Sequence, residues 1–147
     1  MLPQRKRNRL EQYDYQENGA YFITACAKEK KAIFGQVVEN TEDASVFVRL
    51  SPLGKTVEKY LLRIPQLQRS VIMPNHVHLL LLLENSEVSV PQIIQSWKIL
   101  VTKEAGFSPW QRSYHDHVIR NQTDFDRIWT YIENNPARWN LDCLYVD

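Results

Sequence analysis

Cysteine is scarce in this 147-residue chain, which contains only Cys26 and Cys143. The two lie far apart, and neither belongs to a C-x-x-C pair, so neither a disulfide framework nor a zinc knuckle is indicated. This composition fits a reducing compartment best. We therefore expect a cytoplasmic protein.

Long apolar runs and glycine-rich segments are also missing. No stretch reaches the roughly 18 apolar residues of a membrane-spanning helix, and the basic segment 1–9 is not followed by the apolar core of a secretory signal. We therefore expect no membrane partner. The four glycines do not form a phosphate-binding loop. With 44% hydrophobic and 24% charged residues, residues 1–147 are predicted to form one globular domain.

Net charge is small, at +1, but it is unevenly distributed. Four cations, Arg5, Lys6, Arg7 and Arg9, precede the first acidic residue, Glu11. A short basic arm of this kind, which we place at residues 1–12, is a common electrostatic contact for phosphates. A solvated tail without a binding role is the alternative.

Hydrophobic periodicity and turn signals predict an alternating order of strands and helices. The predicted strands are 21–26, 33–38, 46–50, 68–73 and 77–84, and a further extended segment lies within 110–120; the predicted helices begin at Ser51–Pro52, at Val90 and at Thr123, and Gly106 and Pro136 end the last two. We expect 21–26 and 33–38 to pair as an antiparallel hairpin. The order favours an α+β fold in which an antiparallel sheet carries helices on one face, as in a ferredoxin-like sandwich.

Two histidines stand out within the most apolar strand. His76 and His78 follow Met73-Pro74-Asn75 and lead into five consecutive leucines. Because side chains alternate across a strand, both imidazoles share one face and can bind one divalent ion. A single histidine on such a strand is usually a hydrogen-bonded core residue, but two polar groups at this spacing need a shared partner.

A second group of polar side chains lies on the last predicted helix. Tyr131 and Asn135 are four residues apart and so share a helical face, with Arg127 one turn earlier and Arg138 just beyond the end. A phenol, an amide and guanidinium groups together suit a phosphate ligand. The alternative is that Tyr131 packs beside its apolar neighbours and that Asn135 caps the helix before Pro136.

These two groups occur in an order that resembles a known family. His-x-His after Met-Pro-Asn, followed by Tyr131 to Pro136 on a late helix, is similar to the REP-associated tyrosine transposases, which are HUH single-strand nucleases with one catalytic tyrosine. The resemblance extends over nearly the whole chain, through segments 9–15, 19–24, 93–102 and 110–120.

The resemblance implies a transposase-like endonuclease that acts on single-stranded DNA hairpins. It implies that Tyr131 is the nucleophile, that His76, His78 and Asn135 hold a divalent metal, and that the basic arm helps to bind DNA beside the hairpin. Cleavage would leave a 5′-phosphotyrosine and a free 3′-hydroxyl, so rejoining needs no nucleotide cofactor.

Physical chemistry is compatible with these roles. Two imidazoles and an amide oxygen leave open positions on Mg²⁺ or Mn²⁺, which can polarise a phosphate. The phenol of a tyrosine has an ordinary pKa of about 10, so it needs nearby positive charge or a proton acceptor to attack. Arg127 and the metal are both candidates for that charge, and we expect Arg127 and Arg138 to contact DNA.

Three questions stay open at this stage. His115-Asp116-His117 is a second His-x-His, which supports a rival hypothesis of a four-histidine metallohydrolase acting on a small substrate. A DNA-binding module that has lost cleavage is another. Because Asn121-Gln122 is a short connection to the tyrosine helix, we expect a monomer, with a homodimer that exchanges this helix as the alternative.

Overall fold

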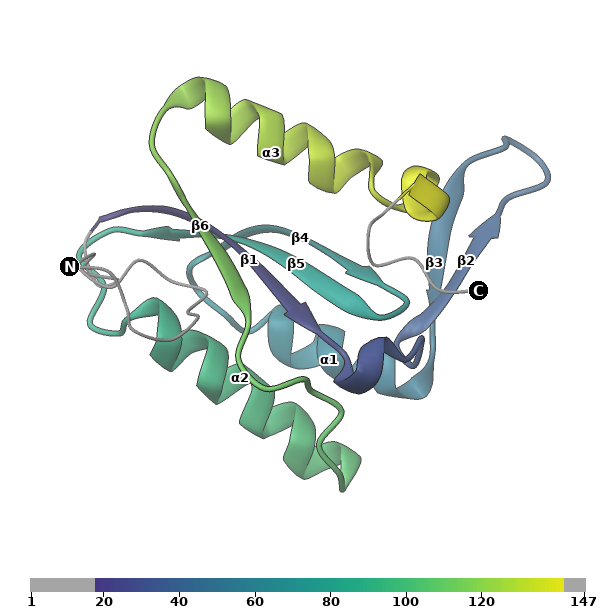
Figure 1. Ribbon diagram of the computed structural model, residues 1–147, viewed down its shortest axis with the longest axis horizontal. Helices are drawn as coiled ribbons and strands as arrows, with labels where there is room; N and C mark the ends of the chain where they lie inside the picture. The colour runs from purple at the N-terminus through teal and green to yellow at the C-terminus, as the bar shows by residue number, and fades with distance from the viewer. Residues whose placement is uncertain (1–17, 142–147) are drawn as a thin grey trace.

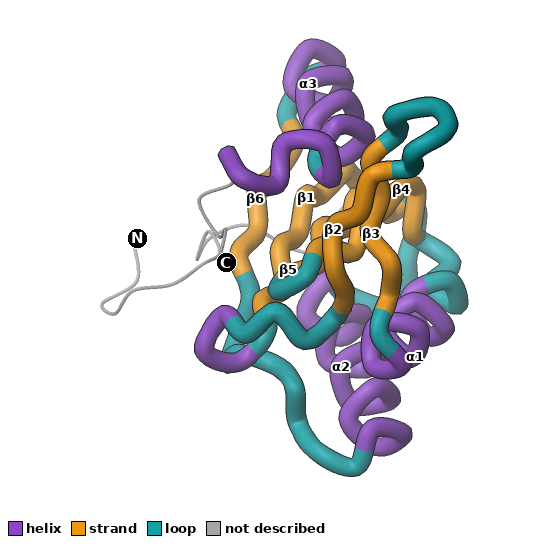
Figure 2. The backbone as a smooth tube through the Cα atoms, turned by 90° about the vertical axis from the view of Figure 1, so that its right-hand side faces the viewer, coloured by secondary structure: helices purple, strands orange, loops and turns teal. Residues whose placement is uncertain are grey.

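The computed structural model describes residues 18–141 and shows a central antiparallel sheet with helices on both faces (Figures 1 and 2). Its elements are β1 (Gly19–Cys26), η1 (Lys28–Lys30), β2 (Gly35–Glu39), β3 (Val46–Leu50), α1 (Pro52–Leu61), β4 (Leu67–Met73), β5 (His76–Leu83), α2 (Val90–Ala105), β6 (His115–Ile119), α3 (Gln122–Asn134) and η2 (Pro136–Leu141), where η marks a short 3₁₀ helix. None of the helices in this described range is long and apolar enough to cross a membrane.

The four-stranded sheet has the order β4-β5-β1-β6, and every neighbouring pair is antiparallel. Apart from the β2–β3 hairpin, the chain runs β1-α1-β4-β5-α2-β6, which is the ferredoxin-like connection order. The predicted α+β fold with helices packed on an antiparallel sheet is therefore confirmed. The β2–β3 hairpin projects from one end of the sheet, and α3 is added after β6 (Figure 1).

The expectation that all helices cover one face is correct for α1 and α2 and wrong for α3. Val57 of α1 and Trp97 of α2 belong to one buried core with Leu79 of β5, whereas Ile128 and Ile132 of α3 pack with Leu80 on the opposite face. Strand β5 is apolar on both faces, so each face needs a cover. Figure 2 shows α3 on one side of the strands and α1 with α2 on the other.

The expected hairpin between 21–26 and 33–38 is wrong. Strand β1 pairs with β5 along one edge and with β6 along the other, and β2 pairs with β3. Tyr21, Ile23 and Ala25 of β1 are fully buried. A strand with such an apolar face lies at the centre of the sheet, where both edges are already occupied.

Local signals explain where α1 and α2 begin and end. The side chain of Ser51 accepts a hydrogen bond from the backbone N–H of Gly54 at 3.0 Å, and Ser89 forms a capping box with Gln92. Gly106, at φ 84°, ends α2 in the left-handed conformation that favours glycine. The start of α1 and both ends of α2 are thus determined by residues that are recognisable in the sequence.

Candidate functional site

The two histidines of β5 lie together under α3. His76 and His78 are both buried, and their ring centroids are 4.7 Å apart. Both point to the face that Leu80 shares with α3, as strand alternation requires. Buried imidazoles in contact with each other are unusual in a core that is otherwise apolar, because each carries two polar ring nitrogens.

One nitrogen of each ring is held by a neighbouring oxygen. The Nδ1 atom of His76 lies 2.8 Å from Oδ1 of Asn75, whose amide nitrogen donates to the carbonyl oxygen of Lys30. Since that oxygen can only accept, His76 donates from Nδ1, and in the neutral ring its Nε2 is the nitrogen with the lone pair. Nδ1 of His78 lies 2.8 Å from the hydroxyl Oγ1 of Thr24 on β1. The Nε2 atoms of both rings are buried. His76, which is held through Nδ1 by an oxygen acceptor, has the arrangement typical of a metal-binding histidine.

Tyr131 of α3 lies beside this pair. Its ring centroid is 5.4 Å from that of His78, and Phe22 of β1 contacts both rings, stacking on His78 at 5.1 Å and meeting Tyr131 edge-on at 6.1 Å. Tyr131 is nevertheless 43% exposed. The phenol is therefore partly open to solvent while its ring is held by two neighbouring rings.

Asn135 is buried one helical turn after Tyr131. Trp139, one further turn along the chain, lies 6.1 Å from His76 between ring centroids. Asn135 lies between Tyr131 and Trp139 in the chain. Its Oδ1 atom is buried, and no donor in residues 18–141 hydrogen-bonds to it.

The beginning of α3 is attached to the sheet by a charged group. Asp124 pairs with Nε2 of His117 on β6 at 2.6 Å and also with Arg127. The hydrogen bond from His117, and then that from Arg127, hold the pKa of the Asp124 carboxyl below its usual value. Further along α3, the guanidinium of Arg69 on β4 lies over the ring of Trp129 at 4.5 Å. These contacts position the helix that carries Tyr131.

The remaining predicted site residues are placed as follows. Arg127 is exposed and is held by Asp124, and Arg138 is exposed in η2. Arg5, Lys6, Arg7 and Arg9 lie outside the described residues. His115 is exposed on β6, and within residues 18–141 no three His, Cys, Asp or Glu side chains come together in a way that could bind a metal.

Four residues of this site escaped the sequence analysis: Thr24, Asn75, Phe22 and Trp139. Asn75 entered the sequence analysis only as part of Met73-Pro74-Asn75, although its position next to His76 was a usable signal. Thr24 and Phe22 become visible only through register, because Thr24 lies directly opposite His78, and Phe22 lies opposite Leu80. Trp139 depends on how α3 crosses the sheet.

Comparisons with known proteins place the chain among relatives. No model of a known protein family matches it. An uncharacterized protein of Haemophilus influenzae is 33% identical over a 175-residue alignment that covers 97% of this chain and 94% of that protein. The chain belongs to the same family as this protein.

A solved structure shows the fold that this family adopts. It is a REP-associated tyrosine transposase bound to a REP hairpin, which is 21% identical and has a TM-score of 0.62, with 86% of this chain and 72% of that chain covered. At this identity the likeness establishes the fold. The resemblance that the His-x-His and tyrosine motifs carried is thus confirmed at the level of the fold.

Proposed function

We propose that this protein is a transposase-like endonuclease that binds single-stranded DNA hairpins and cleaves one strand through Tyr131. The observation that carries the proposal is the contact between Tyr131 and His78, because it brings α3 and β5 together at one polar site. The fold shared with a hairpin-bound tyrosine transposase supports the same substrate class. Basic side chains at Arg127, Arg138 and the arm 1–12 are the proposed DNA contacts.

The residues present fit a divalent metal, for which we propose Mg²⁺ or Mn²⁺. His76 and His78 offer two nitrogens whose rings are oriented by Asn75 and Thr24, and Asn135 offers a buried amide oxygen. No third His, Cys, Asp or Glu joins them within residues 18–141, so the ligand set would remain open to oxygen atoms of a substrate. When bound, such an ion would polarise the scissile phosphate and neutralise part of its charge.

The proposed reaction is a transesterification at one phosphorus atom. The phenolic oxygen of Tyr131 forms a bond to phosphorus, and the bond from phosphorus to the 3′ oxygen breaks. The phenolic proton is lost and the departing 3′ oxygen gains one, so the products are a 5′-phosphotyrosine and a 3′-hydroxyl. The reverse reaction rejoins a strand without further energy input. Phe22 and His78 hold the phenol in place from two sides.

The geometry supports this function over the two alternatives. A four-histidine hydrolase needs His115 and His117 beside His76, yet His117 pairs with Asp124 on α3 instead. A module without cleavage would have no need for an exposed phenol beside buried imidazoles. Tyr131 reaches the histidines of its own chain, which supports catalysis within a monomer.

The test is covalent capture of DNA. Protein is incubated with Mn²⁺ and labelled single-stranded oligonucleotides that carry hairpins from repeats beside the gene, and a denaturing gel is run for a protein–DNA adduct. Tyr131→Phe should form no adduct, while hairpin binding and the free energy of unfolding stay within about 0.5 kcal/mol of wild type, as for other exposed positions.

Tyr60→Phe is the matched control, because it removes the same hydroxyl from α1, where it donates to Glu104. It should form the adduct normally. An adduct that persists in Tyr131→Phe would show that another residue is the nucleophile. Hairpin binding without any adduct would favour the module that lacks cleavage.

A further inference from the structure

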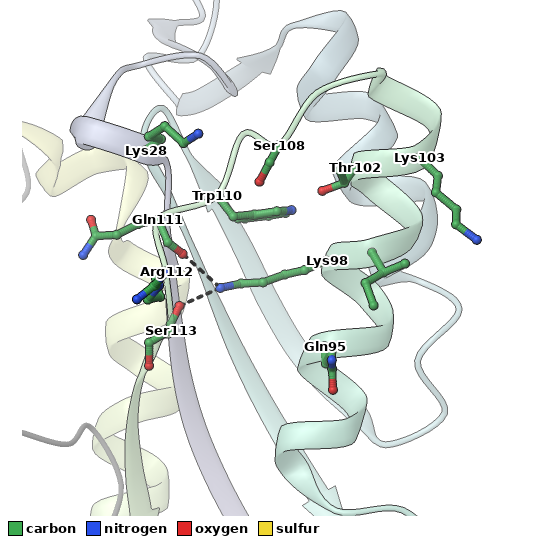
Figure 3. A pocket seen from close by; sticks show the side chains of 11 residues that line it. Lys28, Gln95, Lys98, Thr102, Lys103, Ser108, Trp110, Gln111, Arg112 and Ser113 are labelled. Atoms are coloured by element: carbon green, nitrogen blue, oxygen red, sulfur yellow. Dashed lines mark hydrogen bonds between the residues drawn. The ribbon is translucent and has the colours of Figure 1, made fainter.

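A groove lined by basic side chains lies beside α2, on the face of the sheet opposite to the histidine pair. It has a volume of about 610 Å³ and runs between α2 and segment 108–113 (Figure 3). Four cations line it, Lys28, Lys98, Lys103 and Arg112, and no Asp or Glu is among its lining residues. Hydroxyl and amide groups of α2 and of segment 108–113 supply further donors. A surface with this composition attracts a polyanion.

The four cations have different roles. Lys98 spans the groove, and its Nζ atom donates to the carbonyl oxygens of Ser113 at 2.6 Å and Gln111 at 3.3 Å (Figure 3). It therefore fixes the width of the groove. Lys28, Lys103 and Arg112 are exposed, and no acidic side chain in residues 18–141 pairs with them. Their charge is available to a ligand.

The aromatic residue of the groove limits what kind of ligand fits. Trp110 is only 6% exposed, and its ring packs against Trp97 and Phe34 at centroid distances of 4.8 and 5.3 Å. A base cannot stack on a ring that is covered in this way. The accessible groups are apolar surface that includes Ile99, together with cations and hydrogen-bond donors that can contact phosphate and sugar oxygens without reading bases.

The groove is close to the candidate site through the end of β1. Cys26 pairs with His76 in the sheet, and the backbone N–H of Gln111 donates to the carbonyl oxygen of Cys26 on its other side. Gln111 is therefore two strand spacings, about 10 Å, from His76.

We infer that this groove binds the sugar-phosphate backbone of the DNA whose strand is cleaved at Tyr131. The inference rests on the proposed function and adds to it a second contact surface, made by Lys28, Lys103 and Arg112. The groove positions the DNA without selecting its sequence.

The test compares two double variants in the Tyr131→Phe background, which leaves the DNA uncleaved. Lys28→Gln with Arg112→Gln removes two groove charges, and Arg49→Gln with Lys55→Gln removes one arginine and one lysine that are exposed on β3 and α1. Affinity for a labelled hairpin oligonucleotide with a single-stranded extension is measured from 0.1 to 1 M salt.

The groove variant should lose about 1.4 from the slope of log K against log salt if single-stranded DNA lies there, and about 1.8 if duplex DNA does. The ratio of parent affinity to variant affinity should therefore be about 25 to 60 times larger at 0.1 M salt than at 1 M salt, because the parent gains more affinity as the salt concentration falls. The control variant should keep the parent slope. With Tyr131 restored and DNA saturating, the control variant should form the adduct at the wild-type rate.

Two results would overturn the inference, and they are distinguishable. If both double variants bind alike while wild type still forms the adduct, the groove does not hold DNA and the proposed cleavage stands. If the parent protein binds no hairpin and wild type forms no adduct, the proposed function fails together with the inference.

Discussion

Thr24→Val is the sharpest test of how the histidine pair is held. The change replaces a hydroxyl by a methyl group of similar shape on a strand that favours β-branched residues. It removes the hydrogen-bond partner of Nδ1 of His78, now 2.8 Å away. Loss of such an orienting partner typically weakens metal binding 10- to 100-fold, which equals about 1.4 to 2.7 kcal/mol.

The effect is measurable as stabilisation by metal. At a Mn²⁺ concentration of about 100 times Kd, wild type should gain about 2.7 kcal/mol in its free energy of unfolding. At the same concentration, Thr24→Val should gain only about 1.4 kcal/mol for a tenfold weaker site, or about 0.4 kcal/mol for a hundredfold weaker one. Urea unfolding with and without Mn²⁺, together with titration calorimetry, gives both quantities.

Thr41→Val is the control. Thr41 is exposed in the turn between β2 and β3, and it is not one of the site residues described above. Its gain from Mn²⁺ should equal that of wild type. If Thr24→Val folds normally and binds Mn²⁺ as tightly as wild type, then the Thr24 hydroxyl does not orient a ligand and the argument from the Nδ1 partners is wrong.

Two further predictions concern the scaffold. Gly54→Ala should lower the free energy of unfolding by about 3 kcal/mol or more, because the added Cβ would lie 2.0 Å from the backbone oxygen of Phe34. Urea unfolding measures this loss, and an unchanged urea midpoint would contradict the packing. The pairing of Asp124 with His117 should stabilise the protein above the ordinary carboxyl pKa of 3.8 and lose this effect as the pH falls through the lowered pKa of Asp124. The difference in unfolding free energy between wild type and Asp124→Asn should therefore shrink as the pH falls below 3.8, whereas a difference that keeps growing below pH 3.8 would refute the pairing.

Much of the local structure was readable from residue patterns. The proline and serine signals at Ser51 and Pro52, and Gly106, predicted where α1 begins and where α2 ends, and the structure agrees. The hairpin between 21–26 and 33–38 was predicted wrongly because a short turn between two strand-like segments says nothing about which edges are already taken. The third helix was assigned to the wrong face for a similar reason.

The sequence by itself determined which side chains share a face. His76 with His78, and Tyr131 with Asn135, follow from the repeats of a strand and a helix, which are properties of the local backbone. Only the tertiary structure decided that the Thr24 hydroxyl hydrogen-bonds to His78. It also decided that the rings of Phe22 on β1 and Tyr131 on α3 both contact the ring of His78 on β5. Those contacts depend on strand register and on the burial of α3 against β5. Both result from packing among residues far apart in the chain, which no local pattern records.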